Sequence, residues 1–344
     1  MTGQLTKRAG NILAATVENY IRTAQPVASN RVRKEYQFPI SAATIRNTMA
    51  VLEQYGYLMH PHTSAGKIPT DKGYRTYVDR LMVVESLDAD VAGQVKRNLD
   101  KLSGDLDALL QIVAAIISKL SGGVGIAITP VNLKSRLLAV RLLTVSESRL
   151  ILILELDSGA VRTIVAEGER AVSETEMVTL EEILNERLCG LSLVEIQATV
   201  GDRLGGTLAD DLGITALILD NSSELLTDRR QSEVHVQGLP RVLTSPEFDE
   251  QSQVVTLVSL VEDEGRLRNL FIEHRPAGAT HVTIGDEHGE EELATFASIS
   301  RSFYRGSAVG TLAVLAPKRV NYSQAFAVLE FLGTTMTQLM LGQD

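Results

Sequence analysis

Apolar residues recur at spacings of three and four along three segments near the start of the chain, and this periodicity predicts three helices. The predicted helices cover residues 5–23, 29–36 and 41–55. Ile45, Met49 and Leu52 form the inward face of the third helix, which Gly56 is expected to end in the left-handed conformation. A short strand from Tyr57 and a turn rich in small residues then predict a β-hairpin.

Three short helices followed by a hairpin are the order of a winged helix-turn-helix, in which the third helix enters the major groove of duplex DNA. On its polar face, Arg46 and Asn47 have side chains that read guanine and adenine edges. Ala43 is small enough to let the backbone approach the bases. Ser41 and Thr44 suit contacts with phosphate or with a thymine methyl group. We therefore predict that these five residues contact DNA.

The hairpin turn offers a second set of candidate contacts. An imidazole, two hydroxyl groups and a cation occur there close together, in His62, Thr63, Ser64 and Lys67. Such groups suit phosphate or minor-groove contacts, which add affinity more than sequence information. We expect these four side chains to extend the DNA surface beyond the third helix.

The basic residues of the chain are concentrated in the same region. Residues 1–82 contain 11 Lys and Arg against 5 Asp and Glu, a net charge of +6, whereas the whole chain carries −10. Residues 83–344 therefore carry −16. Because counterion release depends on the local basic patch and not on the total charge, this split favours nucleic-acid binding by the start of the chain.

The remainder of the chain alternates between strand-like and helical patterns. A helical segment up to Leu120 precedes β-rich runs over 124–169 and then helical spacing over 173–230, where Thr179 and Glu182 have the spacing of a capping box. Strands are predicted again over 281–285, 294–304 and 308–315, before a final helix over 323–341. One account of this order is an α+β domain interrupted by a mainly helical insertion, which the periodicity alone does not establish.

Few features point to a catalytic or metal-binding site. The chain has one cysteine, Cys189, and neither a glycine-rich phosphate loop nor a G-x-S-x-G nucleophile motif. His281, Asp286, Glu287 and His288 could gather around a metal, but an exposed turn explains the same residues and we favour the turn. We expect no enzyme, cofactor or metal. No apolar run reaches the roughly 18 residues of a membrane span and the start of the chain lacks a signal-peptide core, so we expect a cytoplasmic protein.

Three stretches of the sequence resemble one known family. They are SAATIRNTMAVLEQYGYL at 41–58, PHTSAGKIPTDKGYRTYVD at 61–79 and VGTLAVLAPKRVNYSQAFAVLEFL at 309–332. These stretches resemble HrcA, a family of bacterial heat-inducible transcription repressors. The resemblance implies an α+β multidomain chain with a winged-helix domain over 1–82, a GAF-like domain formed by 83–169 and 251–344, and an inserted, mainly helical dimerisation subdomain over 170–250.

The resemblance also implies a function. A chain of this family is expected to bind an inverted-repeat operator upstream of chaperone genes as a dimer, with its activity promoted by the GroE chaperonin. The partners expected are therefore double-stranded DNA, a second copy of the chain and the GroE chaperonin, with no membrane. A metabolite-sensing regulator that uses the GAF-like domain as its ligand pocket is the alternative. An enzyme with an accessory winged helix and an RNA-binding protein are further rivals.

Overall fold

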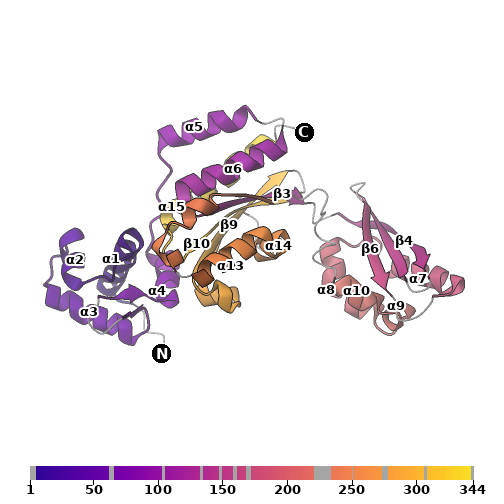
Figure 1. Ribbon diagram of the computed structural model, residues 1–344, viewed down its shortest axis with the longest axis horizontal. Coiled ribbons are helices and arrows are strands. Elements are labelled where there is room, and N and C mark those ends of the chain that lie inside the picture. The colour runs from indigo at the N-terminus through magenta and orange to yellow at the C-terminus, as the bar shows by residue number, and fades with distance from the viewer. Residues whose placement is uncertain are drawn as a thin grey trace. The chain divides into compact units, whose positions relative to one another are not determined.

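The chain is an α+β protein that folds into two compact units. The computed structural model describes residues 5–61, 66–102, 105–131, 135–146, 149–157, 161–167, 172–220, 234–249, 251–272, 278–305 and 308–341. Three predicted contact residues, His62, Thr63 and Ser64, lie outside these ranges. Unit 1 comprises Met1–Ile128, Val234–Phe303 and Thr311–Gln343, and unit 2 comprises Thr129–Glu233 and Tyr304–Gly310 (Figure 1). Within the described ranges, no helix is both long and apolar enough to cross a membrane.

The three predicted helices and the hairpin are present in the N-terminal region, residues 5–82. The elements are α1 (Lys7–Thr23), α2 (Ser29–Glu35), α3 (Ala42–Gln54), β1 (Leu58–Met59), β2 (Ile68–Pro69), α4 (Asp71–Thr76) and the π-helical turn η1 (Tyr77–Leu81). Ser41 caps α3, because its hydroxyl accepts a hydrogen bond from the Thr44 N–H at 3.1 Å. Gly56 follows α3 with φ +74°, a conformation that glycine adopts without strain. The two strands pair antiparallel, with Leu58 opposite Pro69.

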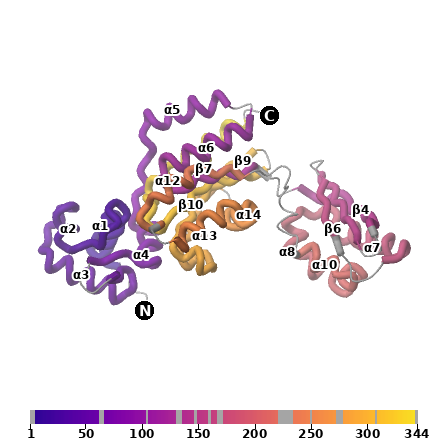
Figure 2. Tube along the Cα trace, in the orientation of Figure 1, coloured from indigo at the N-terminus to yellow at the C-terminus, as the bar shows by residue number. Residues whose placement is uncertain are grey.

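A five-stranded sheet forms the centre of the rest of unit 1. In spatial order its strands are β7 (Val234–Gln237), β3 (Val124–Val131), β10 (Ala308–Pro317), β9 (Phe296–Arg305) and β8 (Thr280–Ile284). One face is covered by α6 (Leu106–Ser121) and α15 (Tyr322–Leu341), beside which lies α5 (Ala89–Asp100) (Figures 1 and 2). The other face is covered by α13 (Gln251–Glu262) and α14 (Glu264–Ile272). Short helical turns complete this part: α12 (Leu239–Val242), η2 (Pro246–Asp249), η3 (Gly285–His288) and η4 (Glu291–Leu293).

The burial of β10 explains why its sequence is almost continuously apolar. Leu312 and Val314 belong to the core that α6 and α15 form with the sheet. Ala313 and Leu315 alternate with them and belong to the core under α13 and α14. A strand that is buried on both faces needs apolar side chains at every position. The central strand of unit 1 therefore has helices on both sides.

Unit 2 is built on a separate three-stranded antiparallel sheet. Its strands, in spatial order, are β4 (Leu137–Ser146), β5 (Arg149–Leu156) and β6 (Val161–Glu167). The helices described in this unit are α7 (Glu174–Leu188), α8 (Leu193–Leu204), α9 (Leu208–Asp211) and α10 (Ile214–Asp220). Along β5, Leu150, Leu152 and Leu154 are buried in one core with these helices, while the residues between them are more exposed. The alternation shows that, among the residues that the structure describes, the helices cover one face of this sheet and leave the other open.

The boundaries of unit 2 differ from those that the sequence suggests. The sequence analysis assigns 83–169 to the GAF-like domain and begins the insertion at 170, whereas the strands over 137–167 share their core with α7–α10. The physical reason is that an alternating strand pattern does not say which sheet a strand joins. At the other end, β7 pairs antiparallel with β3 and so returns the chain to unit 1 before residue 250.

The start of α7 also differs from the expectation. Thr179 and Glu182 have capping-box spacing, but Thr179 lies inside the helix and its hydroxyl donates to the Thr175 carbonyl at 3.0 Å. Ser173 and Glu176 form the capping box instead, with reciprocal bonds between side chain and backbone. Ser173 and Glu176 have the same spacing as Thr179 and Glu182 but lie at the true start of the helix. The predicted capping box at Thr179 and Glu182 is therefore wrong.

Candidate nucleic-acid interface

The helix α3 presents an exposed polar face. Ile45, Met49 and Leu52 are buried in the core shared with α1 and α2, whereas Ala43, Arg46 and Asn47 are exposed. Ser41 is also exposed, and the half-buried Thr44 places its Oγ1 2.9 Å from Ser41 Oγ. Arg46 and Asn47 therefore stand next to each other on the N-terminal half of the helix, the part of a recognition helix that reaches base edges.

Two exposed residues that the sequence analysis did not single out continue this face. Val51 is 46% exposed and Tyr55 is 60% exposed, and they follow Asn47 at spacings of four and eight. Lys72 Nζ lies 2.7 Å from the Tyr55 carbonyl oxygen and 4.5 Å from the centre of the Tyr57 ring, so α4 holds the end of α3. An exposed Val side chain suits a thymine methyl group. The sequence could have indicated Val51, because it is an apolar residue of α3 that does not belong to the inward-facing stripe of Ile45, Met49 and Leu52.

Lys67, the predicted contact at the base of the hairpin, forms an ion pair within the chain. Its side chain is only 8% exposed, and its Nζ lies 2.5 Å from Glu53 Oε2. His60 Nε2 lies 3.7 Å from the other oxygen of the same carboxylate. The hydrogen bond from Lys67 holds the pKa of Glu53 below its usual range. A phosphate contact by Lys67 stays a prediction, and it requires the pair with Glu53 to open.

The hairpin is fixed to the connection between α1 and α2. Val27 and Lys67 exchange two backbone hydrogen bonds, of 2.9 and 3.0 Å. A Cβ atom on Gly66 would lie 2.5 Å from the carbonyl carbon of Val27, so the close approach requires glycine at this position. The base of the hairpin thus has a defined place beside α3.

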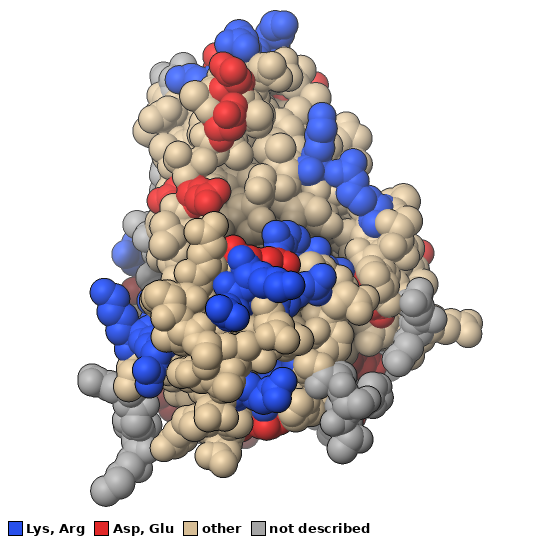
Figure 3. All heavy atoms as spheres, turned by 90° about the vertical axis from the view of Figure 1, so that its left-hand side faces the viewer, with Lys and Arg blue, Asp and Glu red and all other residues tan. Residues whose placement is uncertain are grey.

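Cations are spread over the surface of the N-terminal region (Figure 3). The exposed ones are Lys7, Arg8, Arg22, Arg31, Arg33, Lys34, Arg46, Lys72 and Arg80. Glu35 pairs with both Arg22 and Arg31, and Asn19 Nδ2 donates to it at 2.5 Å. Most Lys and Arg residues of the N-terminal region are therefore exposed, and the region has a net charge of +6. Cations in this position can release counterions from a polyanion.

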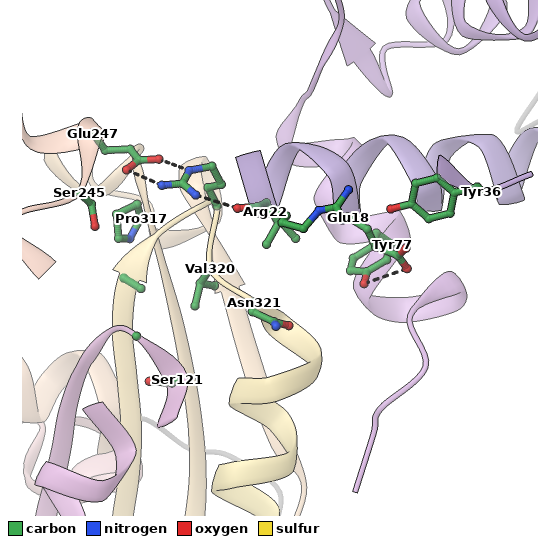
Figure 4. Close-up of a pocket in the computed structure, with 14 residues that line it drawn as sticks. Glu18, Arg22, Tyr36, Tyr77, Ser121, Ser245, Glu247, Pro317, Val320 and Asn321 are labelled. Atoms are coloured by element: carbon green, nitrogen blue, oxygen red, sulfur yellow. Dashed lines mark hydrogen bonds and ion pairs between the residues drawn. The ribbon is translucent and has the colours of Figure 1, made fainter. Parts of the chain in front are cut away.

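A cavity of about 500 Å³ lies beside α1 in unit 1. Its walls carry both charges, with Glu18 and Arg22 on α1 and with Glu247 on the side of the sheet (Figure 4). Arg319 also lines the cavity. Burial raises the pKa of Glu18, and the hydroxyl of Tyr77 lies 3.5 Å from its Oε1. Because its lining carries both charges, and Arg319 is paired with Glu247, the cavity does not define a ligand class.

The residues considered as metal ligands serve other contacts. His288 Nδ1 lies 2.9 Å from the Gly285 carbonyl oxygen, and its Nε2 lies 3.0 Å from Ser298 Oγ. Glu287 binds the guanidinium of Arg75 on α4. Among the residues that the structure describes, no group of three or more His, Cys, Asp or Glu is placed to hold a metal ion. The turn η3 is a contact between parts of unit 1.

The family model and the curated relatives agree on one class. The family model described as HrcA protein C terminal domain matches residues 107–326. The heat-inducible transcription repressor HrcA of Chlorobium chlorochromatii (strain CaD3) is 31% identical over 346 residues, which cover 99% of each chain. The protein of the same description from Pelotomaculum thermopropionicum is 30% identical over 338 residues, which cover 98% of this chain and 97% of the relative. A crystal structure described as that of a hypothetical protein matches with a TM-score of 0.59 and 25% identity, covering 99% of this chain and all of its own.

A basic helical region attached to a larger α+β body is typical of a transcription regulator, and the full-length relatives are transcription repressors. The chain belongs to the HrcA family of heat-inducible transcription repressors. This family is not a class of enzymes, and its name places the chain in the response to heat stress.

Proposed function

We propose that the chain represses heat-shock operons by binding an inverted-repeat operator as a homodimer through its N-terminal region, a winged helix-turn-helix. The observation that carries the proposal is the exposed pair Arg46 and Asn47 on the N-terminal half of α3, in a region of net charge +6. The family membership supports it, since a repressor of transcription must find its operator. In this proposal the rest of unit 1 is the GAF-like domain and unit 2 is the inserted dimerisation domain.

Base readout is assigned to the exposed face of α3. Arg46 can donate two hydrogen bonds to guanine, and Asn47 can pair with adenine. Ala43 and Val51 on the same face suit close backbone approach and a thymine methyl group, while Ser41 suits a phosphate oxygen. Lys67 adds a phosphate contact when its pair with Glu53 opens, and the turn residues 62–64 complete the contact on the hairpin side.

The uncovered face of the sheet in unit 2 is the dimer surface in this proposal. Leu143, Ile151 and Val165 lie opposite one another across β4, β5 and β6, and therefore share one face. Leu143 is 53% and Val165 51% exposed, whereas the neighbouring cross-strand row, Leu142 and Leu152 among it, is buried under the helices. An exposed apolar row on one face of a sheet is typical of a surface that another protein covers.

A dimer gains specificity because two half-sites are read together. One N-terminal region that reaches a few base edges gives modest discrimination, and a second one on a symmetric operator roughly doubles that free energy. Control by the GroE chaperonin, which the family resemblance implies, is part of the proposal. Chaperonin favours the active repressor, and unfolded proteins that occupy the chaperonin during heat stress leave the repressor inactive.

A titration tests the proposal. Purified chain is titrated against an inverted-repeat duplex from a chaperone promoter and against a scrambled duplex at the same salt, with and without the GroE chaperonin. We expect a clear preference for the repeat, which chaperonin enhances by increasing the active fraction. Equal binding to both duplexes would refute operator recognition. A preference that chaperonin leaves unchanged would refute only the proposed control.

The variant Arg46→Ala tests the assigned readout in the same assay. It is expected to relax the preference for one base and to cost roughly 1–3 kcal/mol per half-site. Arg80→Ala is the matched control, since Arg80 is an exposed cation of the same region that lies on η1 and not on α3. An unchanged base preference in Arg46→Ala would show that the readout is misplaced on α3.

A further inference from the structure

A short segment that runs from the end of β10 into the first turn of α15, residues 318–323, contacts the N-terminal region at several points. Lys318 Nζ lies 2.5 Å from Asp71 Oδ1 on α4. Arg319 Nη1 donates to the Ile21 carbonyl at 2.7 Å, near the end of α1, and the rest of its guanidinium binds Glu247. Each bond reaches a different element, so together they restrain rotation as well as separation.

The same segment adds an apolar contact and a backbone contact. The rings of Tyr322 and Tyr74 lie 5.8 Å apart, and both residues are buried. Ser323 Oγ donates to the Val83 carbonyl at 2.8 Å, just after η1. A buried aromatic pair beneath a rim of ion pairs is a packed interface and not a flexible tether. It belongs to the hydrophobic core that the N-terminal helices share with α15.

The turn η3 supplies a second set of contacts to α4. Arg75 Nε lies 2.8 Å from Glu287 Oε1, a second nitrogen binds the other oxygen, and Nη2 donates to the Val282 carbonyl at 2.8 Å. Burial raises the pKa of Glu287, but the Arg75 guanidinium and the Ile284 N–H together hold it below its usual range. A two-point arginine–carboxylate pair fixes orientation in a way that a single charge contact does not.

The fit between η3 and α4 is close. The Asp286 N–H donates to Asp71 Oδ2 at 3.1 Å. Gly285 has φ +54°, and a Cβ atom there would lie 1.9 Å from the same Asp71 oxygen. Any other residue would strain the backbone and displace Asp71 from Lys318. The acidic turn that resembles a metal site in the sequence is therefore shaped around α4.

We propose that these contacts, which we call the α4 junction, position the N-terminal region for operator binding, with Asp71, Arg75, Lys318 and Arg319 as positioning residues. The inference rests on the proposed function, because it concerns how the two N-terminal regions of a dimer reach two half-sites. A rigid junction allows only a narrow range of half-site spacing. A loose one accepts several spacings and loses the benefit of pre-organisation.

The test compares three variants of the full chain. Arg75→Glu places two carboxylates together at the junction. Adding Glu287→Arg restores opposite charges there. Arg80→Glu is the matched control, because it makes the same change of charge on an exposed residue of η1. Thermal unfolding of each variant checks that the chain still folds.

The first readout needs no DNA. A fluorescent label is placed at Gln54→Cys on the exposed side of α3, in a Cys189→Ser background, and its time-resolved anisotropy is recorded. We expect Arg75→Glu to add a nanosecond component of independent motion. The double variant should remove most of that component, and Arg80→Glu should match the unsubstituted chain. The junction is refuted if Arg75→Glu and Arg80→Glu give the same decay.

The second readout is the affinity for inverted repeats whose spacer is lengthened or shortened by one or two base pairs. The unsubstituted chain and Arg80→Glu should each lose about tenfold in affinity on such a change, whereas Arg75→Glu should lose less than about threefold. The double variant should recover the spacing preference. Retention of that preference by a mobile Arg75→Glu would overturn the positioning role. If no form of the chain prefers the repeat to scrambled DNA, the proposed function fails and the positioning role with it, while the anisotropy still decides whether the junction is rigid.

Discussion

Glu53 is a carboxylate on the surface that we propose meets DNA. It lies near the end of α3, where it binds Lys67 at the base of the hairpin and lies near His60. A negative charge here neutralises a cation that phosphate would otherwise attract, and it also repels the backbone of DNA. The pair thus lowers affinity for all sequences alike, while Arg46 and Asn47 remain on the exposed face of the helix.

The substitution Glu53→Gln tests this balance. We expect tighter binding to operator and scrambled duplexes alike, and a plot of log K against log salt that is steeper by about one unit per half-site, since one more cation becomes available. The measurement is a salt titration of both duplexes. Glu174→Gln, the same change at an exposed site on α7 in unit 2, serves as the control. A change confined to the operator would mean that Glu53 takes part in base readout instead.

At the residue scale, the sequence predicts what depends on local periodicity. The buried stripe through Ile45 and the exposure of Arg46 follow from a 3.6-residue repeat that the structure confirms. The partner of Lys67 does not follow, because Glu53 is 14 residues away and meets it only after the hairpin folds back. Contacts such as the hydrogen bond between Asp71 and the Asp286 N–H are even less visible, since they join distant parts of the chain.

At the scale of elements, β3 and α6 approach each other unusually closely. A Cβ atom on Gly125 would lie 2.0 Å from the Ala114 carbonyl oxygen and 2.7 Å from the Ser118 nitrogen. Both are backbone atoms of a helix, which cannot move aside as the end of a long side chain can. The strand and helix therefore pack backbone to backbone at this point, and a glycine is required there for space and not for its dihedral angles.

The substitution Gly125→Ala is expected to force β3 and α6 apart and to destabilise unit 1 by about 1–3 kcal/mol or more. Urea unfolding, with hydrogen exchange of the β3 amides to locate the effect, measures the change. Gly201→Ala is the matched control, because Gly201 lies inside α8 with no atom within 4 Å of its added Cβ. Alanine favours a helix there by roughly 1 kcal/mol, so this variant should be slightly stabilised. Equal stability of the two variants would contradict the close packing.

The sequence predicts whether a segment is a helix or a strand more readily than it predicts which sheet a strand joins. From β8 to α15, for example, the predicted bounds of each strand and helix agree with the observed bounds to within a few residues. The assignment of β4, β5 and β6 to a sheet depended on which helices cover them, and their alternating pattern is compatible with either sheet. Packing between distant segments decides such questions, and periodicity does not record it.

At the scale of the molecule, the two units differ in how their sheets are covered. The central strand of unit 1 is buried on both faces, whereas the sheet of unit 2 has helices on one face and an exposed apolar row on the other. Leu143 and Val165 are the exposed ends of that row, with Ile151 between them. If two copies of the chain pair through this face, then operator recognition depends on a surface far along the sequence from α3.

The substitution Leu143→Lys places a charge in that apolar row and is expected to convert the proposed dimer to a monomer, because a buried, unpaired charge is costly. Sedimentation velocity measures the oligomeric state. Val178→Lys is the matched control, since Val178 is 61% exposed on α7 of the same unit but not on the sheet. The monomer should bind a single half-site as well as the unsubstituted chain does, yet lose the added affinity of the full repeat, because the two half-site energies no longer combine. A dimer that survives Leu143→Lys but not Val178→Lys would move the interface from the sheet to the helical side of unit 2.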